Sequence, residues 1–123
     1  MLIDDAEIAN IIMKKLISFL SLSVEVFDFN DADKAYEAMK TINPDIIFLD
    51  LNMPWLTGWD YLEKMKKDNY CFKVIIVTSS TSFFDKERGR EYKNVVDYLE
   101  KPVSKELVLK YITTPVDYKY AAP

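Results

Sequence analysis

"IIFLDLNMP", residues 46–54, is the stretch of sequence that says most about the fold. Four apolar residues, Ile46 to Leu49, lead directly into one carboxylate, Asp50, and Pro54 closes the segment. A wholly apolar run of this length is typical of a strand that is covered on both faces. An acid at the end of such a strand can be a structural cap, a metal ligand or a nucleophile, and only the rest of the chain distinguishes these roles.

Segments with strand and helix patterns alternate on both sides of this run. Apolar or alternating runs predict strands at residues 1–3, 24–29, 46–49, 74–77 and 95–99. Apolar residues at helical spacing predict helices over residues 8–20, 31–42, 59–65, 84–92 and 107–112. Five such repeats with short connections predict a single doubly wound α/β domain with a parallel sheet, flavodoxin-like, in strand order 2-1-3-4-5. We assign residues 1–114 to this domain and residues 115–123 to a C-terminal tail.

Composition excludes several classes of function. Sixteen basic and twenty acidic residues give a net charge of −4. The sequence has no dense basic block, so we do not expect it to bind nucleic acid directly. The apolar runs are far shorter than the roughly 20 residues that span a bilayer, so we interpret the chain as cytoplasmic, without a membrane segment. The absence of histidine excludes Ser-His and Cys-His nucleophile systems and histidine metal sites. We expect the single cysteine, Cys71, to fill the core.

Polar residues follow the strands that should neighbour one another in the sheet. Asp4 and Asp5 follow the first strand, Asp50 the third and Thr78 the fourth, and Lys101 comes shortly after the fifth. In such sheets, ligands bind beyond the carboxyl ends of the strands where the strand order reverses. Three neighbouring carboxylates repel one another unless they share a cation, and oxygen ligands of this kind favour Mg²⁺. A lysine and a hydroxyl beside them suit a phosphoryl group.

Four motifs together resemble the receiver domain of two-component response regulators: "LIDDAE", "IIFLDLNMPWLTGW", "VIIVTSS" and "VVDYLEKPVSKEL". The resemblance implies that Asp50 is the phosphoacceptor and also a Mg²⁺ ligand. It implies that Asp5 binds Mg²⁺ directly and that Asp4 holds it largely through water. The main-chain carbonyl of Asn52 completes the implied ligand set.

The resemblance also assigns roles around the phosphoryl group. Thr78 corresponds to the hydroxyl that contacts it, and Lys101 to the cation that pairs with it. Tyr98 corresponds to the aromatic switch residue that turns inward when Thr78 moves, repacking the fourth helix, the fifth strand and the fifth helix. Asn52 and Ser80 lie where the family tunes the lifetime of the acyl phosphate. The Lys101-Pro102 bond corresponds to one that is commonly cis in the family.

The implied function is signalling rather than enzymatic turnover. A histidine kinase or histidine phosphotransfer protein would supply a phosphohistidine, and the only self-catalysed steps would be phosphotransfer and slow autodephosphorylation. The output would be contact with a downstream protein, with a homodimer as one form it can take. We expect a stand-alone receiver and keep open a receiver cut from a longer regulator or hybrid kinase.

Other interpretations remain at this stage. A degenerate receiver would act as an interaction or dimerisation module without accepting phosphate, although such a module would have lost an acid or the lysine. A Mg²⁺-dependent phosphatase resembling the haloacid dehalogenases would need an aspartate where Asn52 stands. Taken singly, Asp4-Asp5 can cap a helix, residues 78–80 can form a turn, and Tyr98 can serve packing alone.

Overall fold

β3, Ile47–Leu49, is the middle strand of a five-stranded parallel sheet in the computed structural model, which describes residues 1–20 and 23–113. The strand order is β2-β1-β3-β4-β5, which confirms the predicted order. The other strands are β1 (Leu2–Ile3), β2 (Asp28–Phe29), β4 (Val74–Thr78) and β5 (Val95–Glu100). The helices are α1 (Glu7–Phe19), α2 (Ala32–Ile42), α3 (Gly58–Lys67), α4 (Phe83–Gly89) and α5 (Lys105–Thr113).

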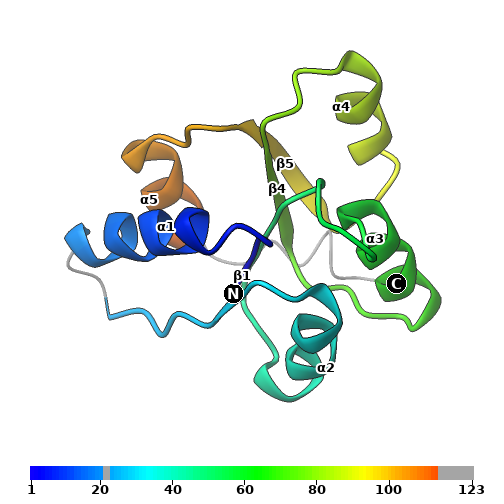
Figure 1. Ribbon diagram of the computed structural model, residues 1–123, viewed down its shortest axis with the longest axis horizontal. Coiled ribbons are helices and arrows are strands. Elements are labelled where there is room, and N and C mark those ends of the chain that lie inside the picture. The colour runs from blue at the N-terminus through cyan, green and yellow to red at the C-terminus, as the bar shows by residue number, and fades with distance from the viewer. Residues whose placement is uncertain (21–22, 114–123) are drawn as a thin grey trace.

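Helices cover both faces of the sheet, as Figure 1 shows. α1 and α5 pack together over the face that carries Phe48, Ile75 and Val77. α2 and α3 pack over the opposite face, where the alternate strand residues Ile47 and Leu49 point. All three residues of β3 are buried, as expected for a strand covered on both sides.

Three elements are shorter than the sequence pattern predicts. The predicted strand 24–29 pairs only at Asp28 and Phe29, because its partner β1 has only two residues in the ladder. The predicted strand 46–49 begins in the ladder at Ile47. The predicted helix 84–92 ends at Gly89, which lies against the sheet: a Cβ there would sit 3.4 Å from Ile76 Cδ1.

α1 turns only part of its apolar residues toward the sheet. Asn10 and Ile17 are its buried residues, whereas Ile8, Ile12 and Phe19 are 64%, 59% and 74% exposed. The physical reason is the Asn10 side-chain amide, which donates hydrogen bonds to the main-chain carbonyls of Asp4 and Phe29. At 3.6 residues per turn, this orientation turns the three apolar residues toward solvent.

Two further expectations are corrected or limited by the structure. Cys71 is exposed rather than part of the core, because it lies in the connection before β4 instead of on the strand itself. The predicted tail, residues 115–123, lies outside the described residues. No helix in the described part of the chain has the length and apolar character needed to cross a membrane.

Candidate functional site

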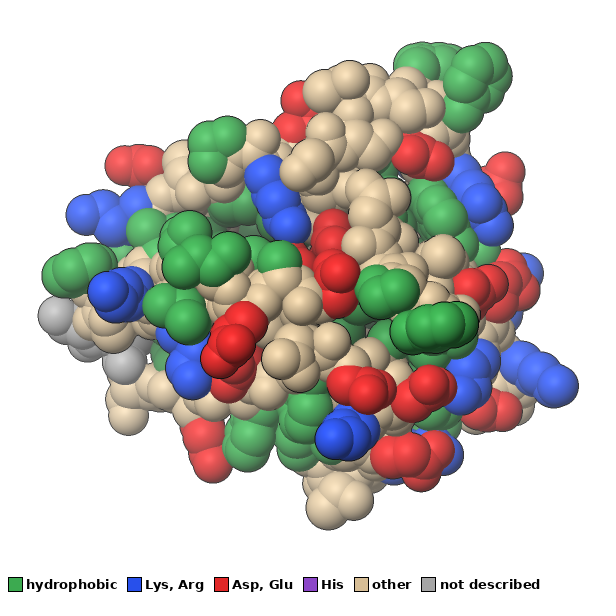
Figure 2. All heavy atoms as spheres, in the orientation of Figure 1, with side chains coloured by type: hydrophobic (Ala, Val, Ile, Leu, Met, Phe, Trp, Pro, Cys, Tyr) green, Lys and Arg blue, Asp and Glu red, His purple; other side chains and the backbone are tan. Residues whose placement is uncertain are grey.

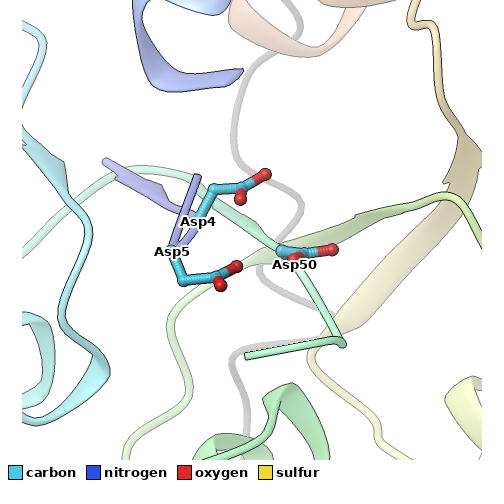
Figure 3. Close-up of side chains that lie close together, drawn as sticks. All are labelled: Asp4, Asp5 and Asp50. Atoms are coloured by element: carbon cyan, nitrogen blue, oxygen red, sulfur yellow. The ribbon is translucent and has the colours of Figure 1, made fainter. Parts of the chain in front are cut away.

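Three carboxylates meet where β1 and β3 end side by side. The Asp50 amide donates to the carbonyl of Ile3 at 2.9 Å, which fixes the end of β3 next to the end of β1. Asp4, Asp5 and Asp50 each offer an oxygen, and these oxygens all lie within 4.8 Å of one another (Figure 3). Asp4 and Asp50 are buried, and Asp5 is exposed. The sequence-predicted acids therefore form one cluster.

Lys101 reaches this cluster from the loop after β5. Its Nζ lies 2.6 Å from Asp4 Oδ2 and 3.7 Å from Asp50 Oδ1. The Lys101 amide donates to the Thr78 carbonyl at 2.8 Å, and the Lys101-Pro102 peptide bond is cis. Burial by itself lowers the pKa of Lys101, but the hydrogen bond to Asp4 and the negative charges of Asp50 and Asp4 outweigh it and raise the pKa overall. The lysine is thus held as a cation beside the carboxylates.

The carboxylates outnumber the positive charge that faces them. Burial raises the pKa of Asp50 above its ordinary value, and the charge of Asp4 adds to this, while Lys101 and a hydrogen bond from the Asn52 amide act in the opposite direction. A carboxylate in this position favours a second cation. The donor set of three clustered carboxylates, with no histidine or thiolate among them, fits Mg²⁺.

Thr78 lies at the end of β4 and is fully buried. Its hydroxyl accepts a hydrogen bond from the Ser80 amide at 3.3 Å and from the Asn52 side-chain amide at 3.5 Å. Asn52 lies two residues past Asp50, so this contact links the loop after β3 to the end of β4. The structure therefore brings Thr78, the predicted hydroxyl residue, together with the two predicted tuning residues, Asn52 and Ser80.

Tyr98 is half-buried on β5 and does not contact the carboxylates directly. Its hydroxyl donates to the Ser80 carbonyl at 3.1 Å, which connects β5 to the loop that follows Thr78. Burial raises the pKa of the Tyr98 hydroxyl, so it stays a hydrogen-bond donor at neutral pH. The predicted switch residue is one hydrogen-bonded residue away from Thr78.

Gly58 is a positioning residue that the sequence analysis did not single out. A Cβ on Gly58 would lie 2.5 Å from the carbonyl oxygen of Asp50 and 2.8 Å from Leu51 Cα. Thr57 caps α3 at this point by accepting a hydrogen bond from the Asp60 amide, and the Gly58 amide donates to Leu51 at 3.0 Å. The signal in the sequence is a glycine directly after a capping threonine, where the loop from Asp50 returns to the site.

The surface around the cluster is apolar on several sides. Figure 2 shows acidic side chains at the centre of this face, with hydrophobic side chains gathered over α1 to their left. Trp55 is 98% exposed, whereas Trp59 packs against the core. A cavity of about 320 Å³ beneath α1 opens beside Asp4, Asp50 and Lys101.

Comparisons with known proteins agree with this geometry. A family model described as the response regulator receiver domain matches residues 1–113. Protein PilG of Pseudomonas aeruginosa is 34% identical over 130 residues, which cover 95% of this chain and 90% of PilG. The nitrate/nitrite response regulator protein NarL of Escherichia coli is 27% identical over 94% of this chain but only 59% of NarL. The chain thus spans little more than half of that longer relative.

Solved structures show the same fold. The receiver domain of Francisella response regulator 1452 superposes with a TM-score of 0.75 at 29% identity, covering 97% of this chain and 93% of that one. The signal receiver domain of a putative Luxo repressor protein from Vibrio parahaemolyticus gives a TM-score of 0.81 at 23% identity, covering 90% of this chain and 83% of that one.

Proposed function

The chain belongs to the response regulator receiver domain family, and from that membership we propose that Asp50 accepts a phosphoryl group from a phosphohistidine of a partner protein. The observation that carries this proposal is the position of the Asp50 carboxylate, which is buried between two further acids and faces the Lys101 ammonium 3.7 Å away. The Asp50 oxygen attacks phosphorus, the bond between phosphorus and the partner's histidine nitrogen breaks, and an acyl phosphate forms.

Asp4, Asp5 and Asp50 would hold Mg²⁺, together with the main-chain carbonyl of Asn52. A bound Mg²⁺ supplies positive charge that offsets the negative charge on the transferring group. Lys101 supplies a second positive charge beside Asp4 and Asp50. Its ammonium can exchange its contact with Asp4 for a phosphoryl oxygen without leaving the site, because it already lies within 4 Å of both carboxylates.

Phosphorylation would act on the rest of the domain through Thr78 and Tyr98. A phosphoryl group adds about −1.5 to −2 charges and three strong acceptor oxygens, to which the buried Thr78 hydroxyl can donate. The Ser80 amide and carbonyl bind Thr78 and Tyr98 respectively, so a shift of Thr78 reaches Tyr98 through one residue. The surface formed by α4, β5 and α5 would change in response and be read by a downstream protein.

The partner that donates the phosphoryl group would be a histidine kinase or a histidine phosphotransfer protein. The exposed apolar residues of α1 begin at Ile8, three residues past Asp5, and offer such a partner a contact surface near the phosphoacceptor. The exposed Trp55 lies on the loop that leaves Asp50 and adds to this surface. The domain is a phosphoacceptor rather than an enzyme, and we propose that residues 1–114 form it, whether it acts alone or within a longer regulator.

The test is chemical phosphorylation. Incubation with Mg²⁺ and acetyl phosphate should add the mass of one phosphoryl group to the intact protein, and neither Asp50→Asn nor a sample with EDTA should gain it. A wild-type protein that stays unlabelled, under conditions that label a known receiver, would instead support the degenerate interaction module.

A further inference from the structure

Ser80 uses all of its hydrogen-bonding groups at once. Its amide donates to the Thr78 hydroxyl, and its carbonyl accepts from the Tyr98 hydroxyl. Its own hydroxyl donates to Asp85 Oδ2 at 2.7 Å and accepts from the Ser82 amide at 3.2 Å. The residue two positions past Thr78 is thereby tied to α4 as well as to the phosphoacceptor site.

The partner of the Ser80 hydroxyl, Asp85, lies in the first turn of a short helix. α4 has seven residues and stands beyond the end of β4 at the top of Figure 1. Its first two residues, Phe83 and Phe84, are 69% and 83% exposed and so give this end little apolar packing. The Ser80–Asp85 hydrogen bond therefore joins the exposed end of α4 to the loop from β4.

The other end of α4 is attached independently. The Arg88 guanidinium lies over the Trp59 ring at 4.5 Å, and Gly89 lies against the side chain of Ile76. Losing the Ser80–Asp85 contact would leave the start of α4 held by its Ser82 cap and the Ser80 oxygen held only by the Ser82 amide. The Ser80 hydroxyl proton would then be free to turn to another acceptor, while the end of the helix stays in place.

We propose that Asp85 is a positioning residue for the phosphoryl site: it holds the Ser80 hydroxyl on α4 and so keeps it from assisting hydrolysis of the acyl phosphate on Asp50. In that hydrolysis, water attacks phosphorus, the bond between phosphorus and the Asp50 oxygen breaks, and inorganic phosphate leaves with the water's oxygen. A released Ser80 hydroxyl can orient the attacking water, whereas one that donates to Asp85 cannot. This inference rests on the proposed phosphorylation of Asp50.

The experiment compares the lifetime of the phosphorylated wild-type protein with that of five variants. Protein labelled with acetyl phosphate and Mg²⁺ is desalted, and the loss of the phosphoryl mass is followed over time. Asp85→Ala should shorten the half-life about threefold or more, the change expected when one hydrogen bond is lost. Asp85→Asn keeps an acceptor oxygen without the charge and should retain the wild-type half-life. Glu87→Ala removes a carboxylate from the same helix, where it forms an ion pair with Arg90, and should also have no effect.

The last two variants, Ser80→Ala and the Ser80→Ala/Asp85→Ala double mutant, separate action through Ser80 from a general effect on α4. In a Ser80→Ala background, Asp85→Ala should produce no further change in half-life. An unchanged half-life in Asp85→Ala, an equal change in Glu87→Ala, or an effect that persists in the Ser80→Ala background would each overturn the proposal.

A second measurement needs no phosphorylation and separates this inference from the proposed function. Scalar couplings measured by NMR in the unphosphorylated protein report the rotamer of the Ser80 side chain. Wild type and Asp85→Asn should show one rotamer, and Asp85→Ala should show averaging over several. A single unchanged rotamer in Asp85→Ala would refute the positioning role, even if the wild-type protein failed to accept a phosphoryl group.

Discussion

Replacing Asp50 with its neutral isostere, Asp50→Asn, should stabilise the metal-free protein. At an effective dielectric constant of about 20, two like charges no more than 4.8 Å apart repel by at least ~3 kcal/mol, and the Lys101 ammonium at 3.7 Å attracts Asp50 by ~4 kcal/mol. Lysine therefore offsets roughly one of the two neighbouring acids. The repulsion from the second acid and the burial of the charged Asp50 remain as destabilising contributions. The repulsion from Asp5 is weakened, because Asp5 is exposed to solvent.

We expect a net gain of about 1–2 kcal/mol in the free energy of unfolding, or ~4–8 °C in Tm. The sign of the pH dependence follows from the raised pKa of Asp50. A carboxyl whose pKa is higher in the folded state destabilises the protein progressively as pH rises from the unfolded value through the folded one. The advantage of Asp50→Asn should accordingly be larger at neutral pH than in acid and shrink as pH falls toward 3.8.

The assay is urea unfolding in low salt with EDTA, from pH 7.5 downward, with Glu91→Gln as a control for the loss of one exposed acid. Mg²⁺ at ten times its dissociation constant should then stabilise the wild type by about 1.4 kcal/mol and the variant by less. An Asp50→Asn protein that is no more stable than wild type, or whose advantage does not depend on pH, would refute the electrostatic account of the cluster.

Three further predictions test the positioning of the site. Gly58→Ala should lower the free energy of unfolding in urea by about 2–3 kcal/mol, because its Cβ would sit 2.5 Å from a backbone oxygen. In the control Gly89→Ala, the nearest atom to the new Cβ is a side-chain carbon at 3.4 Å, and the loss should be less than 1 kcal/mol. Equal losses in the two variants would contradict this. Lys101→Met leaves two buried acids without their cation, so the free energy of unfolding in EDTA should fall by about 2–3 kcal/mol. Acetyl phosphate should also label this variant at least tenfold more slowly than wild type. Labelling at the wild-type rate would exclude a role for the lysine in phosphorylation. Thr78→Val should remove the response of the Tyr98 ring resonances to beryllofluoride in NMR spectra. A response equal to wild type would show that Tyr98 responds independently of Thr78.

The sequence predicted the centre of the fold better than its edges. Ile47 to Leu49 are buried on both sides, and a run with that property has few alternatives to a central parallel strand. Asp31 caps α2 through the Lys34 amide, as its position before an amphipathic helix indicates. The clustering of Asp4, Asp5 and Asp50 followed from the strand order, since the strands that precede them are neighbours.

Features that depend on tertiary partners were not accessible from local patterns. The orientation of α1 depends on where the carbonyls of Asp4 and Phe29 lie relative to Asn10, which periodicity does not encode. The length of β2 depends on the length of β1. The role of Gly58 depends on how closely the loop from Asp50 returns to α3, a distance that only the folded chain defines.

The central claim, that Asp50 is the residue phosphorylated, can be tested by locating the modification directly. Protein treated with acetyl phosphate and Mg²⁺ is reduced with borohydride, which converts an aspartyl phosphate to homoserine, and the digested peptides are sequenced by mass spectrometry. The account predicts homoserine at position 50 and unmodified aspartate at positions 4 and 5. Homoserine at position 4 or 5, or none in a sample that carries a phosphoryl group, would contradict it.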